Sequence, residues 1–90
     1  MYLHLGNDIL VKTEDIIGIF DLDNATLSRH TRNYLSKSEK EKQVIYVSYD
    51  LPKAFIVCKN KNDEKQKIYI SQISSQTLLK RIGYLENLKE

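Results

Sequence analysis

The chain has 90 residues and a formal net charge of +2, with 14 lysines and arginines against 12 aspartates and glutamates. This length fits one domain, residues 1–90, with a thin core, and the single cysteine, Cys58, excludes a disulfide within the chain. No apolar run approaches the roughly 20 residues of a membrane span, so we expect no membrane partner. Alternating residues follow Met1 at once and leave no room for a secretory signal, so we expect a cytoplasmic protein.

The first fifteen residues predict two short strands and a corner. Apolar and polar side chains alternate over residues 2–5, which predicts a strand, and a second strand follows over 9–12. The Gly-Asn-Asp sequence at 6–8 predicts a turn between them, because glycine and asparagine tolerate positive φ. Residues 13–15 predict a single helical turn or tight corner, capped by Thr13.

Residues 16–41 predict one buried and one exposed element. The segment 16–21 is β-branched and almost entirely apolar, so we expect a strand that is buried on both faces. Gly18 in its middle predicts a bulge or a close backbone approach. Asp23 or Asn24 then caps a helix over 25–41, whose narrow apolar stripe places it on the surface.

The next two predicted strands form a hairpin. Residues 43–49 alternate well, and the turn at 50–52 contains Pro52, which interrupts hydrogen bonding there. In the strand over 53–59, one face carries Ala54, Ile56 and Cys58 and the other face carries two more apolar residues. This spacing predicts that the two strands pair with each other.

The last third predicts a loop, a strand and a helix. Residues 60–66 are polar and charged, which predicts an exposed, mobile loop, and a final strand follows over 67–71. Ser74 or Ser75 caps a helix that runs to about Lys89. Gly83 lies inside its apolar pattern and is expected to divide it into a packed half and a looser half.

These elements predict an α+β fold, a small and mostly antiparallel sheet of about five or six strands with two helices. Small domains often gain stability from disulfides, metals or self-association. Since neither of the first two is expected here, we expect a homo-oligomer. Tyrosine commonly anchors interfaces, although a partly exposed position in a sheet is an equal alternative. The candidate anchors are Tyr46, Tyr49, Tyr69 and Tyr84.

Catalytic and metal chemistry find little support. The sequence has no Gly-rich phosphate loop and no nucleophile elbow. Cys58 and His30 could form a thiolate pair, but Cys58 lies within a strand, where a buried and inert thiol is expected. His4 fits a packed or interface position, and Glu14 with Asp15 fits an acidic helix start better than a metal site. We therefore expect no enzyme activity, metal, cofactor or small-molecule substrate.

Basic residues are the remaining candidates for a functional site. Acidic residues crowd the first quarter of the chain and basic residues dominate later, so one face could be basic enough to meet phosphate. The alternative is a solvated helix face and a charged hairpin tip that blocks edge pairing. The candidates for binding nucleic acid are Arg29, Arg32, Lys53, Lys59, Lys61, Lys80 and Arg81.

Several segments carry a recognisable pattern. The chain opens with Tyr-x-His-Leu-Gly at 2–6 and continues with Asp-Ile-Ile-Gly-Ile-Phe-Asp at 15–21. It closes on Ser-Ser-x-Thr-Leu-x-x-Arg at 74–81, and a Pro-Lys strand at 52–57 lies between. In this order and spacing, the segments resemble the extracellular matrix regulatory protein family, RemA/RemB, and most closely its RemB branch.

The resemblance implies a small α+β domain in the bacterial cytoplasm, assembly into a ring-like or otherwise closed oligomer, and regulation of matrix or biofilm genes. For the RemA branch it implies direct binding of double-stranded DNA. That branch carries two arginines in the turn before its central strand, where this chain has 50–53 with only Lys53 basic. An arginine before the third strand is matched by Asp15. Two readings therefore stay open, a DNA-binding regulator and an assembly protein that does not bind DNA.

Overall fold

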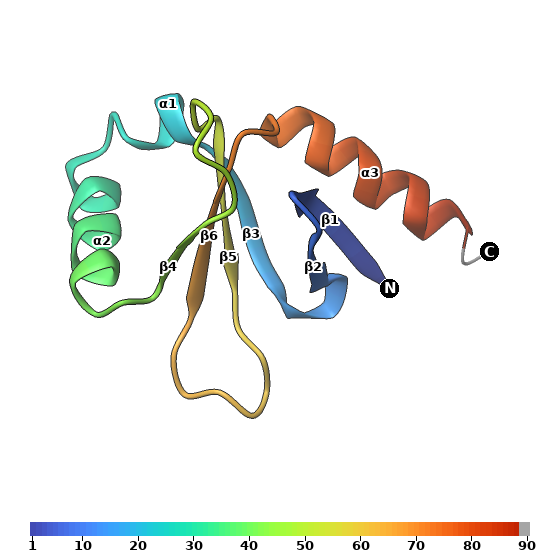
Figure 1. The fold of residues 1–90 in the computed structure, drawn as a ribbon, viewed down its shortest axis with the longest axis horizontal. Helices are drawn as coiled ribbons and strands as arrows, with labels where there is room; N and C mark the ends of the chain where they lie inside the picture. Colours follow the sequence, from blue (N-terminus) through green and yellow to red (C-terminus); the bar gives the residue numbers. More distant parts are fainter. Residues whose placement is uncertain (89–90) are drawn as a thin grey trace.

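The computed structural model describes residues 1–88 and has an α+β fold with six strands, which confirms the predicted class (Figure 1). Most strand pairs are antiparallel. No helix in this described range is long and apolar enough to cross a membrane. The elements are β1 (Tyr2–Gly6), β2 (Ile9–Lys12), the 3-10 turn η1 (Thr13–Asp15), β3 (Ile16–Asp21), α1 (Leu22–Ala25), α2 (Arg29–Lys40), β4 (Val44–Tyr46), β5 (Ala54–Cys58), β6 (Lys67–Ser71) and α3 (Ser75–Leu88).

The strands β1 and β2 form a separate two-stranded sheet around the predicted turn. Asn7 and Asp8 have φ angles of 46° and 65°, as a two-residue turn of the mirror-image type requires, and Gly6 has φ of 113°. Asn7 Nδ2 donates to the carbonyl oxygen of Val47 at 2.9 Å, which fastens the turn to the rest of the molecule. The predicted helical turn at 13–15 is confirmed as η1. Thr13 does not cap it, because Thr13 is its first residue and the Thr13 hydroxyl donates a hydrogen bond to Met1 O.

The four remaining strands form the central sheet in the order β3-β5-β6-β4. The predicted hairpin between residues 43–49 and 53–59 is wrong, because β4 pairs in parallel with β6 and β5 lies on the other side of β6. The connecting segment 47–53 crosses the end of β6, where Val47 N donates to Ile70 O and Lys53 N donates to Ser71 O. These backbone bonds place β4 beyond β6 and out of reach of β5.

The fully buried strand is β5, whereas β3 lies at the edge of the sheet. The prediction that residues 16–21 are buried on both faces is wrong, since Ile17 is 58% exposed and Phe20 is 42% exposed. An edge strand with no complete layer above it leaves apolar side chains open to solvent. The bulge at Gly18 is confirmed, because the register with β5 shifts between Ile16 and Gly18.

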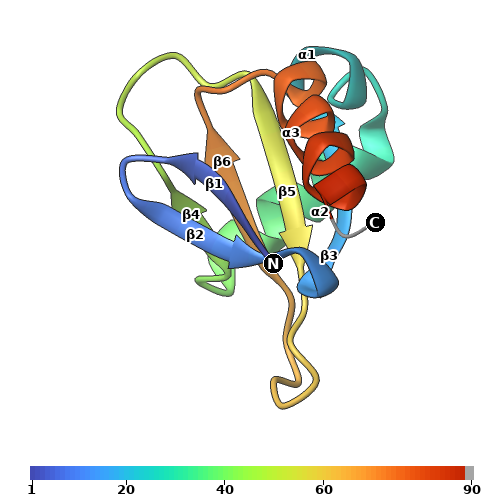
Figure 2. The same ribbon diagram turned by 90° about the vertical axis from the view of Figure 1, so that its right-hand side faces the viewer.

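Two layers cover the central sheet. On one face, Phe55 and Val57 pack with residues of α1 and α2. On the other face, Ala54, Ile56 and Cys58 pack against the β1–β2 hairpin and α3, as the predicted alternation of β5 requires. Figure 2 shows the hairpin and α3 on one side of the sheet and α2 on the other. The thin core is therefore divided between two interfaces of one sheet.

The predicted helix over 25–41 is divided into α1 and α2. Asp21, not Asp23 or Asn24, caps α1 by accepting a hydrogen bond from Asn24 N at 3.1 Å. Arg32 Nη1 then donates to the carbonyl oxygens of Thr26 and Leu27, at 2.7 and 3.1 Å. In a continuous helix these two carbonyl oxygens would accept hydrogen bonds from backbone N–H groups. The Arg32 side chain takes their place and so stabilises the break between α1 and α2.

The C-terminal helix α3 begins as predicted and continues without a division. Ser74 Oγ accepts from Thr77 N at 3.2 Å, which confirms the serine cap. The expected division at Gly83 is wrong, because the helix runs through it to Leu88. A glycine costs only about 1 kcal/mol in a helix, which is too little to interrupt one that packs on the sheet. Lys89, where the prediction ended the helix, lies outside the described residues.

Candidate nucleic-acid interface

The seven basic candidates are exposed and lie in separate places on the single chain. Arg29 and Arg32 lie on α2, and Lys80 and Arg81 lie on α3 at the opposite end of the molecule (Figure 1). Lys59 and Lys61 lie at and beyond the end of β5, in the loop that extends away from the body of the fold. One copy therefore does not gather these residues into a single patch.

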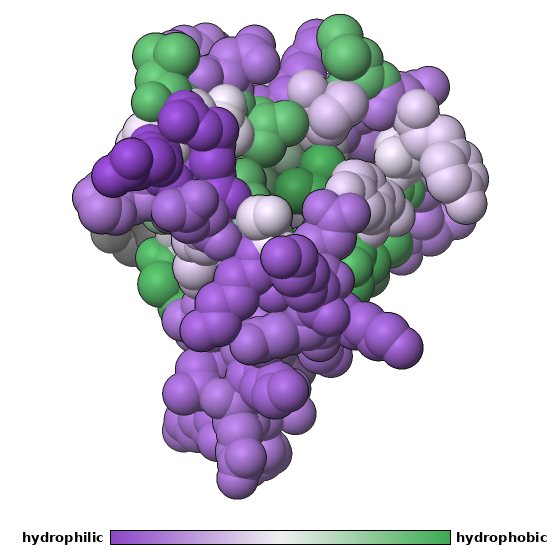
Figure 3. All heavy atoms as spheres, turned by 90° about the vertical axis from the view of Figure 1, so that its left-hand side faces the viewer, coloured by the Kyte–Doolittle hydropathy of each residue, from purple (hydrophilic) through white to green (hydrophobic). Residues whose placement is uncertain are grey.

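The loop between β5 and β6 carries the densest group of cations. It forms a purely hydrophilic projection in Figure 3. Between positions 59 and 67 there are four lysines against two carboxylates, a difference of two positive charges. The lysines are Lys59, Lys61, Lys65 and Lys67. Lys59 N donates to Asp15 O at 2.8 Å and Asn62 N donates to Asn60 Oδ1 at 2.9 Å, so both the base and the tip are organised. Such a tip can reach a phosphate backbone but offers no fixed pair of donors to a base edge.

The basic residues of α2 have different surroundings. Arg32 is committed in part to the break between α1 and α2 through the two hydrogen bonds of its Nη1 atom. Arg29 begins α2 and is exposed beside His30, which is also exposed. Arg29 is therefore the freer of the two arginines to meet an anion.

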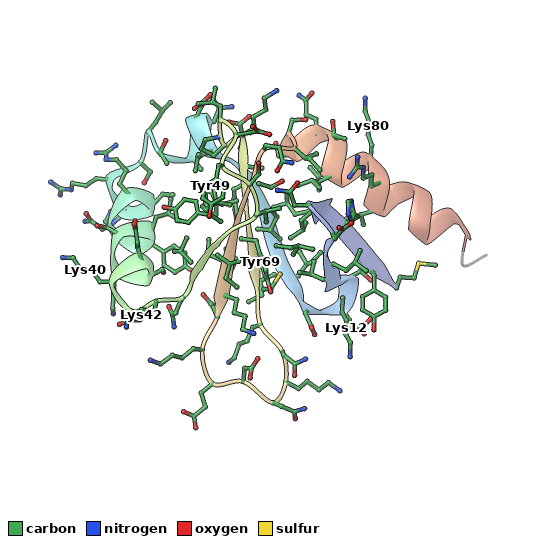
Figure 4. The ribbon with its side chains drawn as sticks, viewed as in Figure 1. Lys12, Lys40, Lys42, Tyr49, Tyr69 and Lys80 are labelled. Carbon is green, nitrogen blue, oxygen red and sulfur yellow. The ribbon has the colours of Figure 1, made fainter. Side chains whose placement is uncertain are left out.

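The basic residues of α3 also divide into a structural and an outward-pointing residue. Arg81 Nη1 donates to the carbonyl oxygen of His4 at 3.1 Å and so joins α3 to β1. Lys80 points away from the body of the molecule (Figure 4). The side chain of His4 is exposed, so the predicted packing of this histidine within the chain is wrong, while an interface position stays a prediction.

Lys53 lies at the end of the segment 47–53, just before β5. Its carbonyl oxygen accepts from Leu22 N and its own N–H donates to Ser71 O, at 3.0 and 2.9 Å. Since both backbone groups are held, the exposed side chain projects from a fixed point. It lies at the opposite end of β5 from the loop lysines.

A cleft of about 240 Å³ opens between the β1–β2 hairpin and the base of the long loop. Sequence reasoning missed that Lys12 lines the same cleft as Lys65 and Lys67, since residues so far apart in sequence give no local signal. Burial, and then the Asp15 carboxylate, raise the pKa of the Cys58 thiol to about 11, so this thiol is buried as predicted and neutral near pH 7. Burial likewise raises the pKa of the neighbouring Tyr69.

Within residues 1–88, no three histidine, cysteine or acidic side chains gather to hold a metal ion.

The predicted tyrosine anchors differ in exposure. Tyr46 and Tyr49 are exposed, Tyr49 fully, whereas Tyr69 is half-buried against the core. The side chain of Tyr84 lies outside the described residues. Tyr46 and Tyr49 are therefore the two anchors that the structure leaves open to a partner.

Comparison with known proteins connects this geometry to a family. The model of the RemA-like family, described as extracellular matrix regulatory protein A-like, matches residues 2–82. The chain belongs to the RemA-like family. Extracellular matrix regulatory protein B of Bacillus subtilis (strain 168) is 41% identical over 85 residues, which cover 94% of this chain and 94% of that protein. These matches confirm the resemblance to the RemA/RemB family and to its B branch.

The RemA-like match extends from β1 to the first half of α3. All seven basic candidates, which lie between positions 29 and 81, fall inside it. They therefore lie within the part of the chain that the family model matches.

Proposed function

We propose that this protein regulates extracellular matrix and biofilm genes in the bacterial cytoplasm, as a homo-oligomer that contacts the backbone of double-stranded DNA. The observation that carries the proposal is the 41% identity to extracellular matrix regulatory protein B over nearly the whole of both chains. The protein acts as a regulator in this proposal, and not as an enzyme. The buried, neutral Cys58 thiol and the exposed side chain of His30 fit that view.

The distribution of charge supports an oligomer as the DNA-binding form. One copy has a formal charge of +2, and its basic residues lie on α2, on the long loop and on α3. A single copy can neutralise few phosphates at once. Repetition around a closed assembly multiplies these weak contacts on one DNA molecule and gives the avidity that one copy lacks. Backbone contacts of this kind position a protein on DNA without reading sequence.

The loop lysines provide the sharpest test of DNA binding. We predict that the double variant Lys59→Glu with Lys61→Glu abolishes the shift of a duplex in gel electrophoresis at low salt. For the unmodified protein, affinity should fall steeply with salt, because each neutralised phosphate contributes about 0.9 to the slope of log K against log salt. The matched control is Lys37→Glu with Lys40→Glu, which makes the same charge change on α2 outside the candidate residues.

Equal loss of binding in both double variants would show that only net charge matters and would contradict a role for the loop. Unchanged binding in the loop variant would also reject it. In each case, light scattering on the same samples confirms that the oligomer is intact.

A second function stays open because two positions depart from the RemA branch. The turn at 50–53, where the resemblance places an arginine pair, has Lys53 as its one basic residue, and Asp15 stands where the resemblance places an arginine. Asp15 Oδ2 accepts from Asn60 Nδ2 at 3.4 Å, so its carboxylate lies at the base of the basic loop. These features favour an assembly protein that regulates through protein contacts. An oligomer that fails to shift DNA at low salt would support this second function over the first.

A further inference from the structure

Two separate apolar surfaces are left open to solvent. The first, here called the groove, has a volume of about 370 Å³ and lies between α2 and the edge strand β3. Its apolar and aromatic lining comes from Ile17, Phe20, Tyr34, Phe55 and Val57, with His30 at one side. The rings of Phe20 and Phe55 stack with centroids 5.0 Å apart, which gives the groove a flat aromatic wall. Figure 3 shows apolar surface exposed among the polar side chains on the α2 side of the molecule.

The second surface, here called the finger, is the segment 47–53 between β4 and β5. Tyr49 is fully exposed and Leu51 is 80% exposed, although the segment is held in place. Val47 and Lys53 form backbone hydrogen bonds to β6 at its two ends, and Asp50 N donates to Ser48 Oγ at 3.0 Å near its tip. Figure 4 labels Tyr49 on this segment. The finger thus presents two large apolar side chains on a pre-ordered backbone, which lowers the entropy cost of docking.

We propose that the finger of one copy of this chain docks in the groove of the next copy. A tyrosine ring can stack on the aromatic wall, and burial of an aromatic side chain removes about 150–250 Å² from water. The charges are also complementary, since Asp50 lies between Tyr49 and Leu51. It would approach the start of α2, where Arg29 and His30 lie. The proposal rests on the homo-oligomer of the proposed function and names the interface that would form it.

The two surfaces are different, so each copy offers both a finger and a groove. The groove is lined by residues of β3, β5 and α2, whereas the finger runs from β4 across the end of β6 to β5. A contact between unlike surfaces joins copies head to tail, and such a contact closes into a ring when the rotation allows.

Docking would also change where the basic residues lie. Lys53 ends the finger, and Arg29 lies next to His30 of the groove. Docking brings Lys53 of one copy towards Arg29 of the next, with Asp50 between them to offset the repulsion. The junction of two copies would then add a basic patch to the one that the long loop already carries in each copy.

The test uses one charged variant on each surface, Leu51→Glu in the finger and Ile17→Glu in the groove. Both side chains are largely exposed, so the single chain should keep its fold, which circular dichroism checks. We expect light scattering to give an oligomer for the unmodified protein and a monomer for each variant. Because each variant keeps one intact surface, an equal mixture should form a one-to-one heterodimer. The matched control is Leu27→Glu, since Leu27 is 79% exposed and belongs to neither surface.

Three results would overturn the inference. The unmodified chain could be monomeric, or the variants could keep the mass of the unmodified oligomer. In the third result, a mixture of the two monomeric variants stays monomeric. Failure of the DNA proposal looks different. In that case the variants behave as expected, but the unmodified oligomer does not shift a duplex at low salt. Failure of the interface alone appears as Leu51→Glu and Ile17→Glu oligomers that still bind DNA.

Discussion

The backbone angles and neighbours of a single residue predict how its substitution changes stability. Two glycines with different surroundings show this. Gly6 has a φ of 113°, and a Cβ built there would lie 2.8 Å from Nε2 of Gln72. Gly83 lies within α3, and a Cβ there would meet nothing within 4 Å. The same substitution should therefore have opposite effects at the two positions.

We predict that Gly6→Ala lowers the free energy of unfolding by about 1–3 kcal/mol, because alanine is strained at this φ. Gly83→Ala should raise it by up to about 1 kcal/mol, since alanine is the better helix former and has room. Urea unfolding followed by circular dichroism measures both. A stable Gly6→Ala variant would contradict the described turn, and a destabilised Gly83→Ala variant would contradict the open position.

At the scale of elements, one serine joins the layers of the fold. Ser71 ends β6 and is fully buried. Its hydroxyl donates to Leu5 O of β1 at 2.7 Å and accepts from Ile73 N at 3.0 Å, just before α3. The hairpin, the central sheet and the start of α3 thus meet at one side chain.

We predict that Ser71→Ala lowers the free energy of unfolding by about 1–3 kcal/mol, because it leaves a buried carbonyl and a partly buried N–H without partners. The expected control is Ser36→Ala on the exposed side of α2, which should change stability by less than about 0.5 kcal/mol. Chemical denaturation of both variants provides the comparison. Equal, small effects would show that the layers do not depend on this bond.

The positions of the strands and the two faces of β5 could be predicted from the sequence, but the partners of β4 and β5 could not. The alternation of β5 correctly assigned Ala54, Ile56 and Cys58 to one face, because alternation records which side of a strand is apolar. It does not record which strand lies alongside. The backbone bonds of Val47 and Lys53 to β6 decide that β4 lies beyond β6, and such bonds carry no side-chain pattern.

Only part of the candidate site could be predicted from the sequence, because a sequence pattern records residue types and not how distant elements pack. The exposed basic residues were identified by type, and the structure leaves them exposed. Their separation on α2, the long loop and α3 depends on how distant elements pack. The groove was missed because the apolar composition of β3 indicated burial, whereas Ile17 and Phe20 lie at an open edge. Apolar composition alone does not distinguish the core of a domain from a surface that contacts another copy.

For the whole molecule, the thin core and the open apolar surfaces have one explanation in common. A domain of this size buries a smaller share of its surface than a large domain does, and this one leaves Tyr49, Leu51 and Ile17 in water. Association that covers these side chains would stabilise the folded chain by mass action, because the oligomer forms only from folded copies.

We therefore predict that the thermal midpoint of the unmodified protein rises with protein concentration. The midpoint of Leu51→Glu should be independent of concentration and equal to that of the unmodified protein at high dilution, since this exposed leucine contributes little to the single fold. Leu27→Glu should follow the unmodified protein at every concentration. Scanning calorimetry over a wide dilution series measures all three. A midpoint of the unmodified protein that does not move with concentration would show that the domain is stable alone, and the exposed finger would then need a partner other than this chain.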